Sequence, residues 1–132
     1  MLVSLICVSL LAFLVMGLAF QVSMARRQTN TVIGHNSDPK DPLYKAIRAH
    51  SNATEYVPII ALLIYILGTM PISSWVLWCM VLITVFRYVA AAGLLFPRTL
   101  EKPNALRFVG ALGTYVVGFL LCIALLLKAL TF

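Results

Sequence analysis

The chain consists of long apolar runs separated by short segments that carry most of its charges. Residues 2–25 contain no charged side chain, and residues 56–86 form a second uncharged stretch. That stretch is too long for one membrane span at about 1.5 Å per residue, and the glycine, proline and serines between Gly68 and Ser74 favour a break between two helices. Because a spanning helix needs about 20 mostly apolar residues, the pattern predicts four helices. They cover residues 2–26, 42–68, 72–95 and 103–130.

The composition excludes an ordinary water-soluble domain. The 132 residues are 62% hydrophobic and 11% charged, whereas soluble domains are roughly 45–50% apolar and about 25% charged. We therefore predict a single all-α domain over residues 1–132, an integral membrane four-helix bundle that contacts membrane lipids. The first apolar run is interpreted as a retained helix and not as a signal peptide, because its basic residues follow the run instead of preceding it.

The cationic residues predict how the bundle is oriented. Ten Lys and Arg residues against four Asp and Glu residues give a net charge of +6. Nine of the ten lie in or beside the first and third predicted connections, and the tenth is Lys128. Since positive residues favour the cytoplasmic side, these two connections should face the cytoplasm. The orientation of the bundle in the membrane thus explains the excess of basic over acidic residues. Nucleic-acid binding is disfavoured because no soluble basic domain is present.

The three cysteines each lie inside an apolar run. This placement predicts small buried apolar side chains, and it argues against a disulfide framework or a metal site. The residues are Cys7, Cys79 and Cys122.

The second predicted helix carries the most informative polar residues. Asp41 and Pro42 predict its start, as a capping carboxylate followed by a proline at the first helical position. At 100° per residue, several polar side chains then share one stripe. They are Tyr44, Arg48, Asn52 and Glu55, with Tyr56 at the border and His50 on a nearly opposite face.

This stripe has two interpretations. A guanidinium, an amide and a carboxylate in one patch can hold a small zwitterionic or anionic ligand between helices. Alternatively, Glu55 only pairs with Arg87 of the third predicted helix and locks the bundle, because ionisable groups near the bilayer normally face the bundle interior and have a partner.

Residues 48–58, Arg-Ala-His-Ser-Asn-Ala-Thr-Glu-Tyr-Val-Pro, resemble the second-helix signature of the MAPEG family (membrane-associated proteins in eicosanoid and glutathione metabolism), which reads Arg-x-[His/Gln]-x-Asn-x-x-Glu-x-x-Pro. Residues 20–27 are similar to the end of that family's first helix. Arg87 and Gly93 match the spacing of its third helix, and residues 107–113 resemble the opening of its last. The likeness covers essentially the whole chain.

The resemblance implies a homotrimer of four-helix protomers, with glutathione as co-substrate between neighbouring subunits near the cytoplasmic face. Family members conjugate glutathione to lipophilic electrophiles, reduce lipid hydroperoxides or isomerise prostanoids. The expected function is therefore that of a glutathione S-transferase with glutathione peroxidase activity. The expected location is the cytoplasmic membrane of a bacterium or the endoplasmic reticulum of a eukaryote.

The resemblance also implies site residues. Arg107 would stabilise the glutathione thiolate, with Arg98 as the alternative because the third connection is longer here than in the family's synthases. The implied glutathione contacts are Arg26, Arg48, His50, Asn52, Glu55, Tyr56 and Arg87.

One departure from the family leaves another function open. Several members carry an aromatic residue or His three positions after the third-helix arginine, and Tyr seven positions after it. This chain has Ala90 and Leu94 there. A non-catalytic lipid-binding or scaffold membrane protein is therefore the alternative, whereas a channel or transporter should show more polar residues at mid-membrane.

Overall fold

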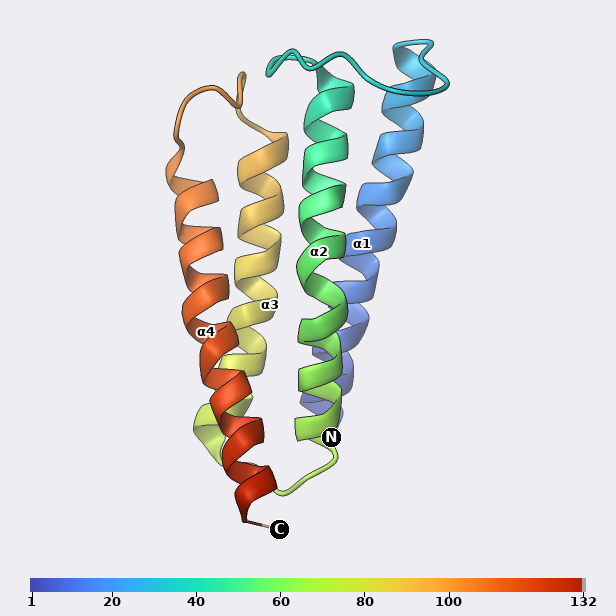
Figure 1. The fold of residues 1–132 in the computed structure, drawn as a ribbon. Coiled ribbons are helices and arrows are strands. Elements are labelled where there is room, and N and C mark those ends of the chain that lie inside the picture. Colours follow the sequence, from blue (N-terminus) through green and yellow to red (C-terminus); the bar gives the residue numbers. More distant parts are fainter. Residues whose placement is uncertain (132) are drawn as a thin grey trace.

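The computed structural model describes residues 1–131 as a bundle of four long helices that run side by side (Figure 1). The helices are α1 (Leu2–Gln28), α2 (Pro42–Gly68), α3 (Ser74–Leu95) and α4 (Ala105–Leu130). The all-α prediction is confirmed. Both predicted bounds of α2 are correct, α1 ends two residues later than predicted, and α3 and α4 each begin two residues later.

Capping side chains determine where two of the helices begin. Asp41 accepts hydrogen bonds from the backbone nitrogens of Leu43, at 3.4 Å, and Tyr44, at 3.2 Å. In the same way Asn104 accepts from the backbone nitrogen of Arg107 at 2.8 Å. Because a cap satisfies the first free N–H groups of a helix, α4 starts just after Asn104 and not at residue 103.

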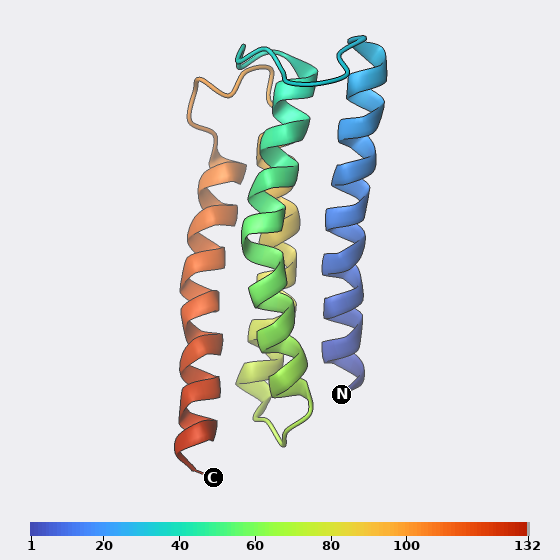
Figure 2. The same cartoon turned by 45° about the vertical axis from the view of Figure 1, so that its right-hand side comes forward.

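The two central helices separate the two outer ones. Helix α1 packs on α2 and α3, helix α4 packs on α3 and α2, and α1 makes no contact with α4. Figure 2 shows α1 and α4 on opposite sides of the bundle. Helix α1 therefore lies on the other side of α2 and α3 from α4.

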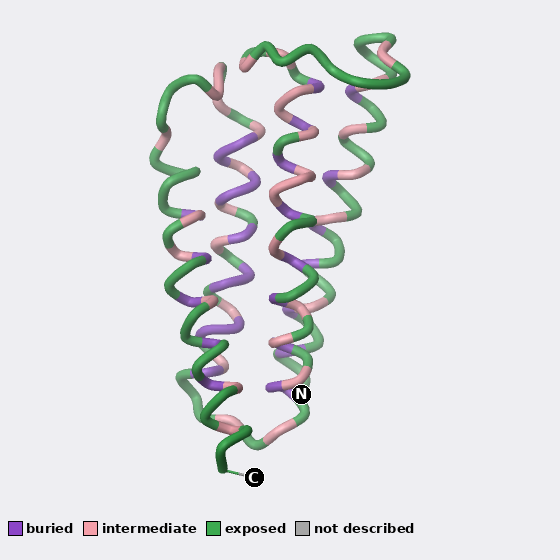
Figure 3. Tube along the Cα trace, in the orientation of Figure 1, coloured by how far each residue is buried: buried purple, intermediate pink, exposed green. Residues whose placement is uncertain are grey.

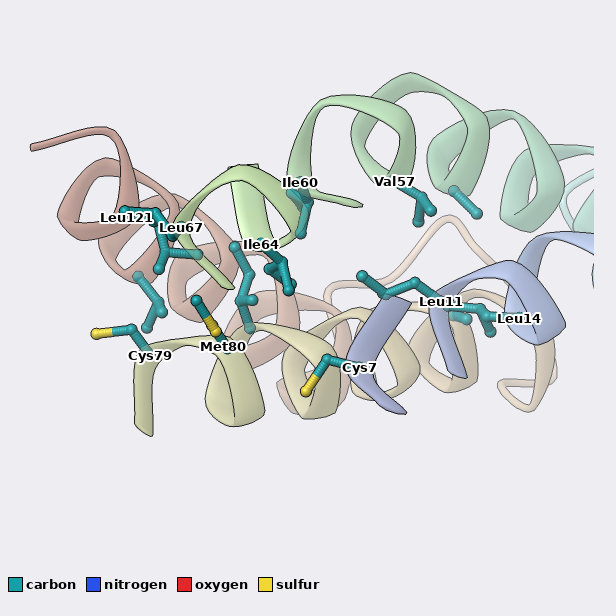
Figure 4. Packing of buried hydrophobic residues seen from close by; sticks show 14 of the residues in the cluster. Cys7, Leu11, Leu14, Val57, Ile60, Ile64, Leu67, Cys79, Met80 and Leu121 are labelled. Carbon is teal, nitrogen blue, oxygen red and sulfur yellow. The ribbon is translucent and has the colours of Figure 1, made fainter. Parts of the chain in front are cut away.

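The core is a seam of buried apolar residues along the inner faces of the helices, and Figure 3 shows the buried positions of the chain in purple. On α2 the buried positions recur every three or four residues, which is the period of one helical face. In Figure 4, Leu11 of α1, Ile64 of α2 and Met80 of α3, all fully buried, lie in this seam. The buried residues of α2 are Leu43, Ala46, Ala49, Ala53, Val57, Ile60, Ile64, Leu67 and Gly68.

The outer faces of the helices also carry many large apolar side chains. Phe13 and Phe20 of α1 and Phe119 of α4 are all exposed, and each of the four helices is long and apolar enough to cross a membrane. Large exposed apolar surface disfavours a water-soluble monomer and suits contact with lipid tails. The protein is a multi-pass integral membrane protein.

The apolar outer faces also explain a wrong prediction. Cys7 and Cys79 are buried as expected, but Cys122 is exposed on α4. In a membrane helix an apolar run continues around the whole circumference. A position inside such a run therefore does not indicate which side faces the core.

The two basic connections lie together at one end of the bundle, which we call the basic end. The backbone nitrogen of Leu100 donates to the carbonyl of Pro39 at 3.1 Å, and Nζ of Lys45 donates to the carbonyl of Pro97, also at 3.1 Å. Figure 1 shows both chain termini and the α2–α3 connection at the opposite end. The first and third connections, which were predicted to face the same side of the membrane, therefore lie at the same end of the bundle.

Candidate functional site

A polar cleft of about 430 Å³ opens between α2, α3 and α4 near the basic end. Three of the predicted site residues line it, together with one tyrosine that the sequence had placed on the same stripe. The lining residues are Tyr44, Arg48, Asn52, Ala90, Leu94, Leu100, Arg107, Ala111 and Tyr115.

Two guanidinium groups dominate the charge of this cleft. Arg48 and Arg107 are both exposed, and the cleft lining contains no acidic residue. Arg107 donates one long hydrogen bond, of 3.4 Å, to the carbonyl of Leu100, and none of the hydrogen bonds among residues 1–131 uses the Arg48 guanidinium. Since arginine binds carboxylates through two parallel N–H groups, the cleft is suited to an anionic ligand.

Close packing of α3 on α4 positions Arg107. A Cβ atom at Gly93 would run into the backbone of Arg107, so only glycine allows α4 to begin this close to α3. Asn104 joins the same two helices, because its Nδ2 donates to the carbonyl of Gly93 at 2.9 Å while its Oδ1 caps the backbone nitrogen of Arg107. Of the two candidate arginines, Arg107 lines the cleft, whereas the exposed Arg98 of the connection does not.

Arg87 lies behind the cleft and holds Asn52. Its side chain is 2% exposed, and its Nη2 donates to Oδ1 of Asn52 at 2.7 Å and to the Asn52 carbonyl at 3.1 Å. The guanidinium also lies over the ring of Tyr56, with 4.9 Å from its central carbon to the ring centre. The partner of Arg87 is thus Asn52. The alternative interpretation of the stripe had paired Arg87 with Glu55, but Asn52 is the stripe residue on the face of α2 that packs against α3.

Tyr115 is a cleft residue that the sequence analysis missed. Its hydroxyl lies 3.1 Å from the hydroxyl of Tyr56. Tyr115 also lines a second, apolar cavity of about 270 Å³, which is open to the outer surface between α2 and α4 and lies farther from the basic end. The spacing of Arg107, Ala111 and Tyr115, four residues apart on α4, was the signal that places them on one face.

Three other predicted site residues do not reach the cleft within one protomer. Arg26 donates to the carbonyls of Val32 and Gly34 at 3.3 and 2.9 Å and so ties the end of α1 to the first connection. His50 and Glu55 are not among the residues that line the cleft, and Glu55 is exposed.

The departure from the family motif falls directly on the cleft. Ala90 and Leu94 both contribute to its lining from α3. The α3 wall is therefore apolar at the two positions where the motif places an aromatic residue or histidine and a tyrosine. Polar contacts for a ligand must come from α2 and α4.

Comparison with known protein families gives one match. The model of the MAPEG family covers residues 4–127, nearly the whole chain. No curated protein and no solved structure matches.

Proposed function

The chain belongs to the MAPEG family, and on that basis we propose that it is a membrane-bound, glutathione-dependent transferase and peroxidase acting on lipophilic electrophiles and lipid hydroperoxides. The observation that carries the proposal is the cleft itself. Arg48 and Asn52 of α2 and Arg107 of α4, which the family motif associates with glutathione, line one cavity.

The charge of the cleft fits glutathione. This tripeptide carries two carboxylates, one ammonium group and a thiol, so it is a net anion at neutral pH, and the lining offers two arginines and no acid. Arg48 and Asn52 hold the peptide, with Tyr56 beside them and Arg87 as the residue that orients Asn52. A site that lacked cationic groups would reject so anionic a ligand.

Arg107 stabilises the reactive thiolate. A free thiol titrates near about 8.5, so only a small fraction is ionised at neutral pH. Lowering the glutathione thiol pKa by about two units requires roughly 2.7 kcal/mol of additional interaction with the charged form. One guanidinium at the edge of a low-dielectric site supplies an interaction of this size.

A homotrimer completes the site. Arg26 lies on α1, which makes no contact with α4, so in this proposal it contributes to the cleft of a neighbouring protomer and not to that of its own chain. Glu55 is exposed on a membrane-spanning helix, where an uncovered carboxylate is costly. A neighbouring subunit would cover Glu55 and place it, with His50, near the ligand. The basic end faces the cytoplasm, in the bacterial inner membrane or the endoplasmic reticulum.

The direct test is thiolate absorbance on adding glutathione to the purified protein. Wild-type protein is expected to show the ultraviolet signal of a bound thiolate at neutral pH, and Arg107→Ala to lose it. Glutathione conjugation should slow by about 25-fold, the ratio of the ionised fractions at pH 7 of thiols that titrate near about 6.5 and about 8.5. Arg98→Ala is the matched control, because Arg98 is exposed and outside the cleft. A full signal in Arg107→Ala would refute the role of Arg107.

The apolar α3 wall supports a second candidate, a non-catalytic lipid-binding or scaffold protein. Ala90 and Leu94 give the cleft a surface suited to an acyl chain. Binding of labelled glutathione separates the two candidates, because the transferase requires it and the lipid-binding protein does not. Absence of binding at millimolar glutathione would favour the second candidate.

A further inference from the structure

Tyr115 lies where the polar cleft and the apolar cavity meet. It is the one residue that lines both cavities among residues 1–131. The apolar cavity runs from the Tyr56–Tyr115 pair along α2 and α4 toward Leu63 and Cys122, and its other lining residues are apolar except for Thr114. A lipophilic molecule that enters from the bilayer would therefore meet the Tyr115 hydroxyl at the point where it approaches the cleft.

The hydroxyl groups of Tyr56 and Tyr115 together carry one donor hydrogen that the bond between them does not use. Each phenol carries a single donor hydrogen, and one of the two is used in the 3.1 Å bond between Tyr56 and Tyr115. No other hydrogen bond among residues 1–131 involves either hydroxyl. The second hydrogen is therefore free to be donated to an oxygen in the cleft.

A buried cation supports this donor. Arg87 lies over the Tyr56 ring, and its hydrogen bonds go to a neutral amide and a carbonyl. Its Nε, buried within the described part of the chain, has no hydrogen-bond partner. A positive charge in a low-dielectric region stabilises negative charge that develops nearby during a reaction. An oxygen bonded to the tyrosine pair lies within the reach of that effect.

We propose that Tyr56 is the donor within the pair and that Tyr115 donates a hydrogen bond, and then its proton, to the oxygen atom of the electrophile when this is a lipophilic epoxide or hydroperoxide. This inference rests on the proposed function, since glutathione must supply the sulfur. It assigns a separate group to each half of the reaction: Arg107 near the basic end for the thiolate, and Tyr115 two turns deeper on α4 for the oxygen.

The proton balance is simple for both substrate classes. With an epoxide, sulfur bonds to a ring carbon, the carbon–oxygen bond breaks, and the oxygen takes the electron pair and the tyrosine proton, which gives a hydroxy thioether. With a hydroperoxide, sulfur bonds to the terminal oxygen, the oxygen–oxygen bond breaks, and the alkoxide takes the proton. The resulting glutathione sulfenic acid reacts with a second glutathione to give the disulfide and water. Tyr115 regains its proton from water.

The test compares electrophiles that differ in their need for a proton. Full-length wild type and Tyr115→Phe in detergent are assayed with glutathione and chlorodinitrobenzene, which releases chloride and needs no proton, and with styrene oxide and cumene hydroperoxide. In Tyr115→Phe, the ratio of kcat/KM for the two oxygen substrates to that for chlorodinitrobenzene is expected to fall by about tenfold or more. The phenylalanine ring keeps the packing, and thermal unfolding of both proteins is measured alongside.

Tyr65→Phe is the matched control. Tyr65 is an exposed tyrosine of α2 that lines neither cavity, so its substitution should leave all three rates and their ratios unchanged. An unchanged ratio in a folded Tyr115→Phe that still turns over chlorodinitrobenzene would overturn the role of Tyr115 and leave the transferase proposal standing. Wild-type protein without turnover of any of the three electrophiles would overturn both.

Discussion

At the scale of single residues, Asn52 connects the buried interior to the cleft. Its side-chain oxygen accepts the shortest of the hydrogen bonds of Arg87, and the same side chain lines the cleft. A buried guanidinium left without an acceptor costs considerable free energy, because its desolvation is no longer compensated. Asn52 therefore contributes to stability through Arg87 and to the proposed ligand site through its position.

Two substitutions separate these contributions. Asn52→Ala removes the side-chain acceptor of Arg87 and leaves only the Asn52 carbonyl. It should lower the free energy of unfolding by about 1.5–3 kcal/mol, seen as a lower unfolding temperature in detergent. Asn52→Asp retains an acceptor for Arg87 and should keep most of the stability. It should nevertheless weaken glutathione binding, because it adds a negative charge to a cleft proposed to hold carboxylates. Wild-type stability in Asn52→Ala would contradict this account of Arg87.

At the scale of elements, the approach of α4 to α3 determines where the cleft lies. Gly93 and Gly110 allow backbone contact between the two helices, since a Cβ atom at Gly110 would meet the backbone of Ala90. Small residues at such crossings are typical of helix packing in membranes. The opening lies beside this contact, and the side chains of Arg107 and Tyr115 extend into it from α4.

Glycine substitutions on α4 test the close approach. Gly110→Ala should force α3 and α4 apart and destabilise the bundle by about 1–3 kcal/mol. Gly118→Ala is the control on the same helix, because its Cβ atom would lie at an ordinary 3.6 Å from Cδ1 of Ile83. Unfolding temperatures in detergent measure the difference. Equal temperatures for both variants would show that the helices yield at Gly110 without loss of stability.

At the scale of the whole molecule, one protomer leaves parts of the proposed site unused. Arg26 is tied to its own first connection on the far side from α4, and Glu55 faces outward. A second protomer placed against α2 would bring its own Arg26 toward the cleft. The trimer is therefore more than a packing arrangement in our proposal, since each site takes residues from two subunits.

Complementation between inactive subunits tests this arrangement. Arg26→Ala and Arg48→Ala should each impair glutathione turnover alone. When they are co-expressed in equal amounts and mix at random, about a quarter of the sites should regain both arginines from two different subunits. Arg48→Ala mixed with Asn52→Ala is the control that should not recover, because both residues belong to the same subunit's cleft. Absence of recovery in the first mixture would contradict a shared site.

The amino-acid sequence by itself determined the four helices, most of their ends and the position of the two basic connections at the same end of the bundle. These features depend on local signals: the length of the apolar runs, the cap at Asp41 and the position of the cationic residues. The family resemblance likewise pointed to Arg48 and Asn52, and to Arg107 with Arg98 as its alternative; Arg48, Asn52 and Arg107 line one cleft.

Only the tertiary structure decided which of the polar residues meet. It paired Arg87 with Asn52 and not with Glu55, joined Tyr115 to Tyr56 and left Cys122 exposed. The physical reason is that lipid is as apolar as the protein core, so hydropathy does not indicate which face of a membrane helix packs inward. The rotation of each helix about its own axis is set by close contacts between residues far apart in the sequence, such as the contact of Gly93 with the start of α4.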